Sequence, residues 1–304
     1  MSCPVRAITS VRVGARTLDY LGLMKLRLNV LVLGAVATGY MLAAGSIVDA
    51  SALVAVLAGV LLASGGSSAL NMAIEAERDR RMVRTRERPV AAGRVTREEA
   101  LIFGTACSVA GVLVAGLGTG WLAAGLIAAT VLLYVFLYTP LKPLTPLNTF
   151  VGAIPGALPP LIGWAAATGT VPPESLALFG IVFLWQFPHF YAIASMYKDD
   201  YARGGFAMLP VVDEGGLRTA HQVLVCAIAL VPIAVLPAVV RLAGPTYFTG
   251  AFGLSLLYLV FSVRATLTRT RSAWRDLLRT SLIVLPGLFV LMMVDRLPLV
   301  AAGV

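Results

Sequence analysis

The sequence predicts an all-α polytopic membrane protein, with nine transmembrane helices in one bundle around a central cavity and the N-terminus in the cytoplasm. Three observations lead to this fold class. The 304 residues are 59% apolar and 13% charged, whereas soluble domains are about 45–50% apolar and about 25% charged. Nine apolar runs are long enough to cross a bilayer, and the basic residues gather on one side of them. We expect residues 1–304 to form a single domain.

Each of the nine runs has the length that a transmembrane helix needs, about 20 residues. The runs are too continuous and too long for the alternating strands of a membrane barrel. They lie near residues 29–47, 51–72, 99–117, 120–139, 148–169, 175–196, 220–240, 246–263 and 279–300. We therefore expect one helix at each of these positions.

The net charge of +9 reflects the side of the membrane on which the basic residues lie, and does not indicate a nucleic-acid partner. If the runs cross alternately, 22 of the 24 basic residues fall on the side of the N-terminus, Arg6 and Arg12 among them. Only Arg241 and Arg296 fall on the other side. Because cytoplasmic loops carry the excess of Lys and Arg, we place the basic loops in the cytoplasm and the chain in the cell membrane.

The first two predicted helices contain few polar residues, but these are informative. Lys25 and Arg27 open the first helix beside Asn29. Such side chains commonly extend to the membrane interface, although an anion held at the cytoplasmic mouth would use the same positions. The second helix carries Gly-Gly-Ser-Ser-Ala at 65–69. Small residues let neighbouring helices approach closely, so we expect this helix to pack inside the bundle.

The most polar stretch of the chain, residues 71–97, follows the second apolar run and holds eight of the 24 basic residues. Asn71, Glu75 and Asp79 are spaced at i, i+4 and i+8. On a continuing helix they share one face, drifting by about 40° per step and spanning about 12 Å. Oxygen ligands beside guanidinium groups suit a magnesium-bridged diphosphate. The alternative is a solvated loop whose charges only set the membrane topology.

Helices three and four show little chemistry, although the fourth ends in Tyr134 and Tyr138. The following connection, 139–148, contains three prolines and should form a stiff turn that places Lys142 at the level of the 71–97 stretch. Helix five is rich in Gly and Pro, so it must be kinked, and the carbonyls that Pro frees need partners in protein or in a wet cavity. We interpret this helix as a cavity wall; a merely bent packing helix is the alternative.

Helix six holds His189 between apolar and aromatic neighbours. Polar residues inside a membrane span are costly and usually functional, so His189 is a candidate ligand-binding residue. The alternative is a histidine that is simply hydrogen-bonded in the core. The helix ends ten residues later, about 15 Å if helical, in a second acidic cluster formed by Lys198, Asp199 and Asp200.

The segment 206–216, which follows this cluster, is moderately apolar and is expected to fold over the cytoplasmic mouth as a lid. Helices seven to nine carry few polar groups inside their spans. We therefore interpret them as scaffold, with the basic residues of 264–279 as charge at the membrane surface.

Two acidic clusters are thus expected at the mouth of one cavity: the oxygen-bearing residues of 71–79, and Asp199 with Asp200. Carboxylates on both sides of a basic patch can hold Mg²⁺ on both sides of one diphosphate, and a membrane cavity beneath can hold a long apolar chain. This arrangement suits the ionisation of an allylic diphosphate, because Mg²⁺ and Arg or Lys stabilise the charge that develops on the leaving group.

Several further segments accompany the pattern Asn-x-x-x-Asp/Glu-x-x-x-Asp and the second acidic motif. They are Met82-x-Arg84-Thr85-x-x-Arg88-Pro89 with Gly93-Arg94, Tyr138-Thr139 with Leu141-Lys142 and Thr145-Pro146-x-Asn148, Pro159-Pro160-Leu-Ile-Gly163-Trp164, Trp185-Gln-Phe-Pro-His189-Phe190, and Asp199-Asp200-Tyr201 leading to Met208-Leu209-Pro210. As a set, they resemble the UbiA superfamily of intramembrane prenyltransferases, and within it the branch that acts on haem. The resemblance covers roughly residues 20 to 220.

This resemblance implies a Mg²⁺-dependent transfer of the farnesyl group of farnesyl diphosphate to the 2-vinyl group of haem b. Water is added, and haem O and diphosphate are the products, for the haem O and haem A of terminal oxidases. The lipid bilayer and a haem A synthase are further implied partners. The implied catalytic residues are Asn71, Glu75, Asp79, Asp199 and Asp200, of which all but Asn71 are implied metal ligands. The implied diphosphate partners are Arg84, Arg88, Lys142 and Lys198, and His189 is the implied haem-binding residue, as iron ligand or polar anchor.

The chain departs from the family pattern at three points, one of which is Leu26 between Lys25 and Arg27, where the family often has Pro. Glu75 stands where Asp is commoner, and the second motif is an adjacent Asp pair, so which of Asp199 and Asp200 binds metal stays open. Two alternative functions also stay open. A prenyltransferase acting on an aromatic quinone precursor has His189 and the adjacent aspartates against it. A nine-helix transporter or channel would not explain two carboxylate motifs on one face.

Overall fold

The computed structural model describes residues 16–45 and 47–297. Nine segments of this part are long and apolar enough to cross a membrane, as predicted. Arg6 and Arg12 lie outside the described residues. The first five spans are α2 (Leu26–Ala44), α3 (Ala50–Arg80), α4 (Arg97–Thr119), α5 (Trp121–Leu132) continued by η1 (Leu133–Tyr138) and α6 (Thr139–Leu141), and α7 (Asn148–Ala157) with α8 (Pro159–Thr168).

The remaining four spans lie in the second half of the chain. They are η2 (Pro173–Ser175) with α9 (Leu176–Met196), α12 (Leu217–Val239), α13 (Pro245–Thr268) and α14 (Arg271–Val294). Two short helices, α10 (Lys198–Arg203) and α11 (Leu209–Val212), connect α9 to α12. The described residues contain no β-structure beyond one isolated bridge between Ala243 and Arg296.

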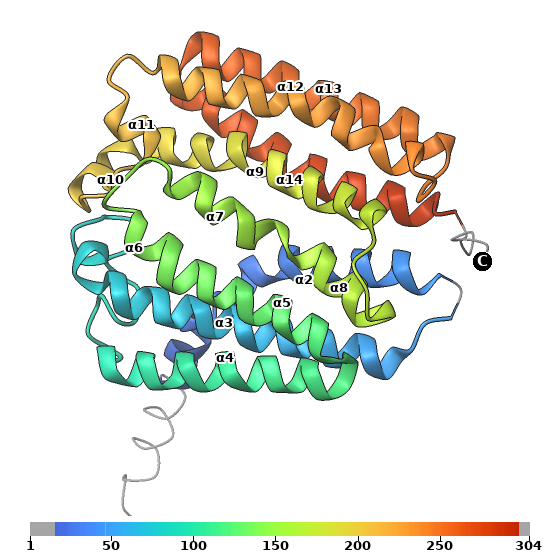
Figure 1. Ribbon diagram of the computed structural model, residues 1–304. Coiled ribbons are helices and arrows are strands. Elements are labelled where there is room, and N and C mark those ends of the chain that lie inside the picture. The colour runs from blue at the N-terminus through green and yellow to red at the C-terminus, as the bar shows by residue number, and fades with distance from the viewer. Residues whose placement is uncertain (1–15, 46, 298–304) are drawn as a thin grey trace, which may run out of the picture.

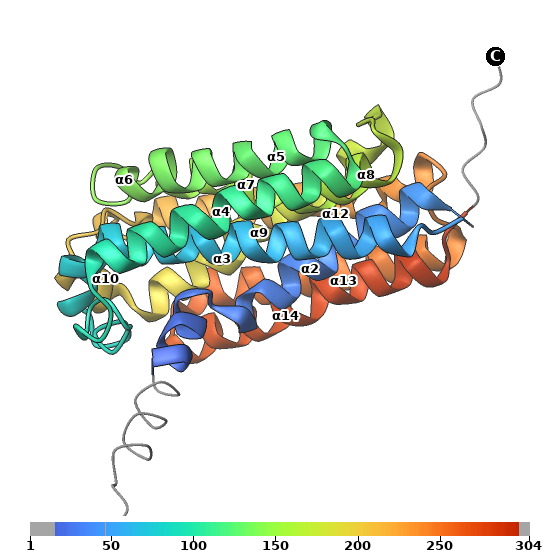
Figure 2. The same cartoon turned by 90° about the horizontal axis from the view of Figure 1, so that it is seen from below.

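The long helices lie side by side, with α12 and α13 along one edge of the bundle and α3 and α4 along the opposite edge (Figure 1). The short elements α6, α10 and α11 gather at one end, and the view from below shows α6 and α10 at that same end (Figure 2). We call this the loop end; it comprises residues 81–96, α6, α10 and α11. The polar motifs of the sequence therefore meet at one end of an apolar bundle.

Helix α3 is 31 residues long and continues beyond its apolar run into the polar motif. It starts at a side-chain cap, because the Asp49 carboxylate accepts hydrogen bonds from the backbone N–H groups of Ser51 and Ala52. No Pro interrupts the helix before it ends at Arg80. The prediction that the acids of 71–79 lie on a continuing helix is confirmed.

Helices α3 and α4 touch through glycines. A Cβ atom built on Gly66 would lie 2.5 Å from the Gly104 carbonyl oxygen, and one built on Gly104 would lie 2.8 Å from the Gly66 carbonyl oxygen. Only glycine leaves room for backbones this close. The expected close packing of the second helix is thereby confirmed. The glycine contact lies on the side of α3 that faces α4, whereas the buried acidic residues of α3, Glu75 and Asp79, face the interior of the bundle.

The fifth span is broken, as its prolines predict. Leu158 separates α7 from α8, because Pro159 and Pro160 supply no backbone N–H to continue the α7 ladder. The fourth span ends in a π-helical turn over Leu133–Tyr138, which the sequence did not indicate. Both irregularities lie in helices that approach the loop end.

Helix α14 begins at Arg271, where Thr270 caps it by accepting from the Ala273 N–H, and not near residue 279 as predicted. Arginines that were expected as loop charge are therefore helical. The largest buried apolar cluster joins α9, α12, α13 and α14, and a second joins α2, α3, α5 and α8.

Candidate active site

A cavity of about 210 Å³ opens at the loop end. Helices α2, α3 and α9 contribute to its walls, together with the end of the fourth span and the segments that follow α3 and α10. Leu28 of α2 lines it and is 64% exposed. Its polar lining consists of Asn71, Glu75 and Asp79 on α3, Thr149 on α7, four cationic side chains and three tyrosines; the cations and tyrosines are Lys25, Arg84, Arg88, Lys142, Tyr134, Tyr138 and Tyr201.

The three polar side chains of α3 are all buried: Asn71 is 1%, Glu75 5% and Asp79 0% exposed. Asn71 donates a hydrogen bond from its side-chain amide to the Thr139 hydroxyl, 3.1 Å away. The three residues line one cavity, which excludes the alternative of a solvated loop for this part of the stretch. Buried carboxylates need partners, and each of the two has one.

Each of the two buried carboxylates in the stripe formed by Asn71, Glu75 and Asp79 is paired with a cation. The partner of Glu75 is distant in the sequence, and the partner of Asp79 lies in the loop that follows α3. The Lys142 Nζ lies 2.8 Å from a Glu75 carboxylate oxygen. Arg88 binds both oxygens of Asp79, at 2.9 and 2.8 Å. Burial acts to lower the pKa of Lys142, but the neighbouring Glu75 carboxylate raises it overall. Lys142 is therefore charged in the folded protein.

Lys25 is the fourth cation of the cavity and differs from the others. Its backbone has φ 48°, in the left-handed region that a residue with a side chain rarely adopts. Burial lowers the pKa of Lys25 to about 7, with Arg88 and Lys142 as further causes. An amine that is only partly charged near neutral pH and sits among other cations is suited to receiving an anion.

Aromatic rings stand beside these charges. The Lys142 ammonium lies 4.6 Å from the centre of the Tyr138 ring, and the Tyr134 and Tyr138 ring centres are 5.4 Å apart. The Arg84 guanidinium lies 5.3 Å from the Tyr201 ring centre. Ring faces attract cations, so these rings hold the cations in place and also offer stabilisation to a carbocation in the cavity.

The second acidic motif lies differently from the prediction that both motifs face the same cavity. Asp200 is buried and accepts hydrogen bonds from the backbone N–H groups of Val83 and Arg84, at 3.1 and 3.2 Å, and it also pairs with Arg203. Burial acts to raise the pKa of Asp200, but these hydrogen bonds and the pair with Arg203 lower it overall. Asp200 thus fixes the loop that carries Arg84.

The other members of that motif are at the surface. Lys198 and Asp199 are exposed, line neither described pocket, and make no ion pair with the described residues. Their motif contributes Tyr201 to the cavity wall.

The segment after α10, where a lid is predicted, contributes two residues to the cavity wall. Phe206 and Met208 line the cavity, and the Ala207 N–H donates to the Lys142 carbonyl, 2.8 Å away. On the other side, Arg78 donates to the carbonyls of Gly204 and Gly205. The segment is therefore tied both to α3 and to the connection after α6.

His189 does not line this cavity. Its Nδ1 atom lies 2.7 Å from the Ser281 hydroxyl of α14, and its ring stacks on Trp185 with ring centres 4.6 Å apart. Ile193, which does line the cavity, follows His189 by four residues and so lies on the same face of α9, one turn nearer the loop end. Phe190, which follows His189 directly, also lines the cavity, so His189 lies at the edge of the cavity.

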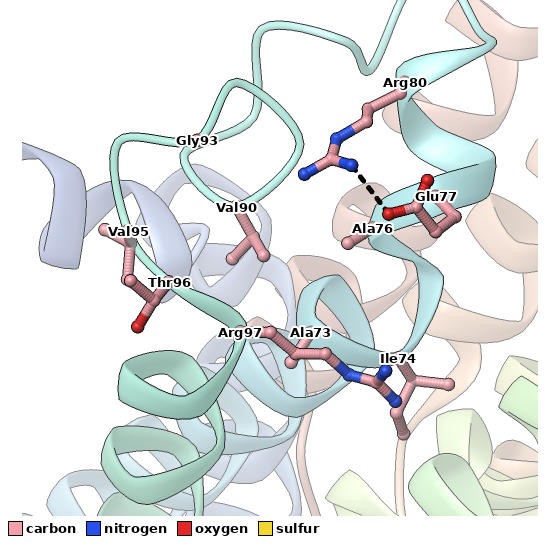
Figure 3. Close-up of a pocket in the computed structure, with 10 residues that line it drawn as sticks. All are labelled: Ala73, Ile74, Ala76, Glu77, Arg80, Val90, Gly93, Val95, Thr96 and Arg97. Carbon is pink, nitrogen blue, oxygen red and sulfur yellow. Dashed lines mark hydrogen bonds and ion pairs between the residues drawn. The ribbon is translucent and has the colours of Figure 1, made fainter.

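A second pocket, of about 260 Å³, lies beside the end of α3 and the start of α4 (Figure 3). Small apolar residues of α3 form part of its wall, and Arg80 pairs with Glu77 at its edge. None of the predicted site residues lines it. The chemistry indicated by the sequence therefore belongs to the first cavity.

The structure brings together six of the ten predicted site residues in one cavity: Asn71, Glu75, Asp79, Arg84, Arg88 and Lys142. Lys25 and the tyrosines belong to the same wall but were not predicted as site residues. Lys25 had been interpreted as an interface residue with an anion-binding alternative. Tyr138 belongs to one of the motifs that carry the family resemblance, whereas Tyr134 has no signal in the sequence beyond its position at the end of the fourth span.

Comparison with known proteins gives a consistent assignment. The sequence profile described as the UbiA prenyltransferase family matches residues 32–285. A protein of Solibacter usitatus (strain Ellin6076) named protoheme IX farnesyltransferase is 44% identical over 287 residues, which cover 91% of this chain and 98% of the relative. A protein of the same name from Koribacter versatilis (strain Ellin345) is 38% identical over 308 residues, covering 97% of this chain and 99% of the relative.

Solved structures share the fold at low sequence identity. A digeranylgeranylglyceryl phosphate synthase superposes with a TM-score of 0.77 at 15% identity, covering 92% of this chain and 98% of that chain. A UbiA homolog from Archaeoglobus fulgidus bound to GPP and Mg²⁺ superposes with a TM-score of 0.63 at 15% identity, covering 90% and 99% of the two chains. The all-helical architecture is thus shared across distant relatives.

Proposed function

Because this chain belongs to the UbiA prenyltransferase family, we propose that it transfers the farnesyl group of farnesyl diphosphate to the 2-vinyl group of haem b. The products are haem O and diphosphate. The observation that carries the diphosphate half of the proposal is the buried stripe of Asn71, Glu75 and Asp79 facing a cluster of cations in one cavity. The relatives' shared name supports haem as the acceptor, since the match extends over almost their full length.

The residues present fit a Mg²⁺ ion that binds together with a diphosphate. Glu75 and Asp79 supply carboxylate oxygens, and no three His, Cys, Asp or Glu side chains gather into a metal site of their own among the described residues. Protein-bound Mg²⁺ commonly has one or two carboxylate ligands and completes its shell with phosphate oxygens and water. We propose Glu75 and Asp79 as ligands; when bound, Mg²⁺ would neutralise charge on the leaving diphosphate.

In this proposal, the two aspartates of the second motif have different roles. Asp200 is occupied by the loop and by Arg203, so it holds Arg84 in position. Asp199 is exposed at the loop end and makes no ion pair there with the described residues, so we propose it, and not Asp200, as the ligand of a second Mg²⁺ ion on the other side of the diphosphate. Lys198, beside it, is proposed as an outer partner of the diphosphate.

The cations of the cavity wall hold the diphosphate in this proposal. Arg84 and Arg88 provide planar groups that bind phosphate oxygens in a bidentate manner, and Lys142 and Lys25 act as point charges. In the absence of substrate, Arg88 and Lys142 are engaged by Asp79 and Glu75. A bound metal–diphosphate complex would offer both members of each pair a new partner, with Asp79 and Glu75 facing the metal and Arg88 and Lys142 facing the phosphate oxygens.

The proposed reaction uses this site to make diphosphate a good leaving group. The C1–O bond of farnesyl diphosphate breaks, and its electron pair leaves with the diphosphate. The terminal carbon of the vinyl group bonds to C1, and positive charge passes to the vinyl carbon attached to the porphyrin. Water adds to that carbon and loses a proton. The rings of Tyr134 and Tyr138 stand where they can stabilise the allylic cation.

We further propose that the whole chain acts as one domain and that the loop end faces the cytoplasm. The arginine-rich loop 81–96 and the cavity lie at this end, and cytoplasmic loops carry the excess of basic residues. This orientation places the chain in the cell membrane with the cavity mouth open to soluble farnesyl diphosphate. A haem A synthase, as a consumer of haem O, is the partner that this function implies.

The proposal is tested with the purified protein, Mg²⁺, farnesyl diphosphate and haem b. We expect mass spectrometry to show a haem that has gained one farnesyl group and one hydroxyl group, and we expect a chelator of Mg²⁺ to stop the reaction. An unchanged haem, with prenylation of a hydroxybenzoate or a naphthoate under the same conditions, would support the aromatic-acceptor alternative.

A further inference from the structure

The buried hydroxyl of Ser281 on α14 lies at the centre of a hydrogen-bond network around His189. The hydroxyl oxygen is 2.6 Å from the Leu278 carbonyl oxygen and 2.7 Å from the His189 Nδ1 atom. The Ser281 side chain is fully buried. The network joins α14 to α9 beside the cavity, next to the cavity-lining Phe190.

The distances determine which atoms carry the protons. A carbonyl oxygen only accepts hydrogen bonds, and two oxygens 2.6 Å apart repel each other unless a proton lies between them. The single hydroxyl proton of Ser281 is therefore donated to Leu278. The Ser281 oxygen must then accept from His189, so the proton of the neutral imidazole is on Nδ1. Its Nε2 atom carries a lone pair.

Two aromatic rings contact this imidazole, and two hydrogen bonds hold the first of them in place. Trp185 stacks on it with planes inclined by 24°, and the Trp185 Nε1–H donates to the Ser281 carbonyl, 2.9 Å away. Tyr258 in turn donates to the Trp185 carbonyl. Phe190 meets the ring edge to face, with centres 5.5 Å apart. The imidazole is thus held in one tautomer and one orientation.

The other nitrogen of the ring is left without a partner. Among the described residues, only Nδ1 of the His189 ring makes a hydrogen bond. The side chain is partly exposed although it lies within a span, and it shares a face of α9 with the cavity-lining Ile193. A histidine that binds a metal through one nitrogen usually donates its other N–H to a neighbouring acceptor, which fixes the tautomer.

We propose that His189 Nε2 ligates the iron of the acceptor haem and that Ser281 is the residue that positions it. This inference rests on the proposed function and adds to it the way in which the acceptor is recognised. Because Phe190 and Ile193 of the same helix line the cavity, a haem held by His189 would lie beside the proposed farnesyl diphosphate site.

The test compares haem b with metal-free protoporphyrin IX, using the full-length protein and its Ser281→Ala variant. Loss of a residue that positions a metal ligand typically lowers metal affinity about 10–100-fold. We expect that loss for haem b, with binding of the metal-free porphyrin nearly unchanged. The optical and electron paramagnetic resonance spectra of bound ferric haem should lose the signature of a single well-defined imidazole ligand.

Matched variants separate positioning from folding. Ser255 on α13 is also fully buried and donates to the carbonyl three residues before it, but it has no histidine partner. Ser255→Ala should therefore bind both porphyrins like the wild type. His189→Ala should lose the imidazole signature, and added imidazole should restore it. Ser281→Thr keeps the hydroxyl and should retain haem affinity if it folds.

Two outcomes would overturn the proposal in distinguishable ways. If Ser281→Ala weakens haem b and metal-free porphyrin equally, or if His189→Ala keeps the wild-type spectrum while haem is still farnesylated, the ligation is wrong and the proposed function stands. If the wild type binds no haem and prenylates only an aromatic acid, both the ligation and the proposed function are wrong.

Discussion

At the scale of single residues, the central feature is that each carboxylate of the α3 stripe already has a cationic partner. Arg88 binds Asp79 through two hydrogen bonds, and Lys142 binds Glu75. The spacing of the stripe could be predicted from the sequence, because helical periodicity alone puts residues four apart on one face. The partners could not, since Lys142 comes from a different helix and Arg88 reaches back from the following loop.

Replacing Asp79 tests whether the stripe holds the metal–diphosphate. Asp79→Ala should lower kcat/KM for farnesyl transfer by about 1,000-fold, because it removes a proposed metal ligand and leaves Arg88 unpaired. Glu77→Ala is the matched control: its side chain is 74% exposed and pairs with Arg80 outside the cavity. Steady-state assays of both variants should show loss in the first only. Equal losses would mean that the helix, and not the cavity face, is what matters.

Lys25 gives a pH-dependent prediction. Burial and the charges of Arg88 and Lys142 lower its pKa to about 7, against the opposing effect of Glu75 and Asp79. Below pH 7 the amine is already charged, and above pH 7 it is mostly neutral until an anion binds. Diphosphate binding at pH 8 should therefore take up about one proton more in the wild type than in Lys25→Met.

Calorimetry in two buffers of different ionisation enthalpy measures this proton uptake for Lys25. The difference between wild type and variant should shrink at pH 5.5, where the amine is charged before binding. Identical proton uptake by the two proteins at pH 8 would remove Lys25 from the diphosphate site. The sequence alone left its role open, since its placement depends on a left-handed backbone conformation that no local pattern of Lys and Leu indicates.

At the scale of elements, the nine spans and the break in the fifth followed from the apolar runs and the prolines. The π-helical turn at Leu133–Tyr138 and the early start of α14 did not. The first depends on how the fourth span meets its neighbours. The second depends on a cap at Thr270 that lets a charged stretch remain helical beyond the apolar run.

The contact between α3 and α4 can be tested by adding a single methyl group. Gly66→Ala places a Cβ 2.5 Å from the Gly104 carbonyl oxygen and should destabilise the fold by about 1–3 kcal/mol. Gly34→Ala on α2 meets nothing within 4 Å and should be neutral or stabilising by about 0.5–1 kcal/mol. Thermal unfolding in detergent compares the two. A stable Gly66→Ala would show that the helices are not this close.

At the scale of the whole molecule, the bundle separates a scaffold from a reacting end. The clusters that join α9 with α12, α13 and α14 hold one side, and all the cavity-lining charges lie at the loop end. The sequence predicted this end through its charge distribution. The sequence could not predict that Asp200 binds the backbone of the loop and does not line the cavity. In either arrangement Asp200 would lie at the same end of the bundle, so its position in the sequence does not distinguish the two.

The proposed orientation can be measured with single cysteines in a background that lacks the three native ones. Glu214 is exposed beyond α11 at the loop end, and Thr170 is exposed at the connection between α8 and η2. A membrane-impermeant maleimide should label Thr170→Cys in intact cells, and Glu214→Cys only after permeabilisation. The reverse pattern would place the loop end outside the cell.

The most direct test of the central claim is a competition in one vessel. The purified protein is given Mg²⁺, farnesyl diphosphate, and equal concentrations of haem b and 4-hydroxybenzoate, and the products are identified by mass spectrometry. We predict farnesylated haem that carries one added hydroxyl group, and no prenylated benzoate. Prenylated benzoate with unchanged haem would contradict the account.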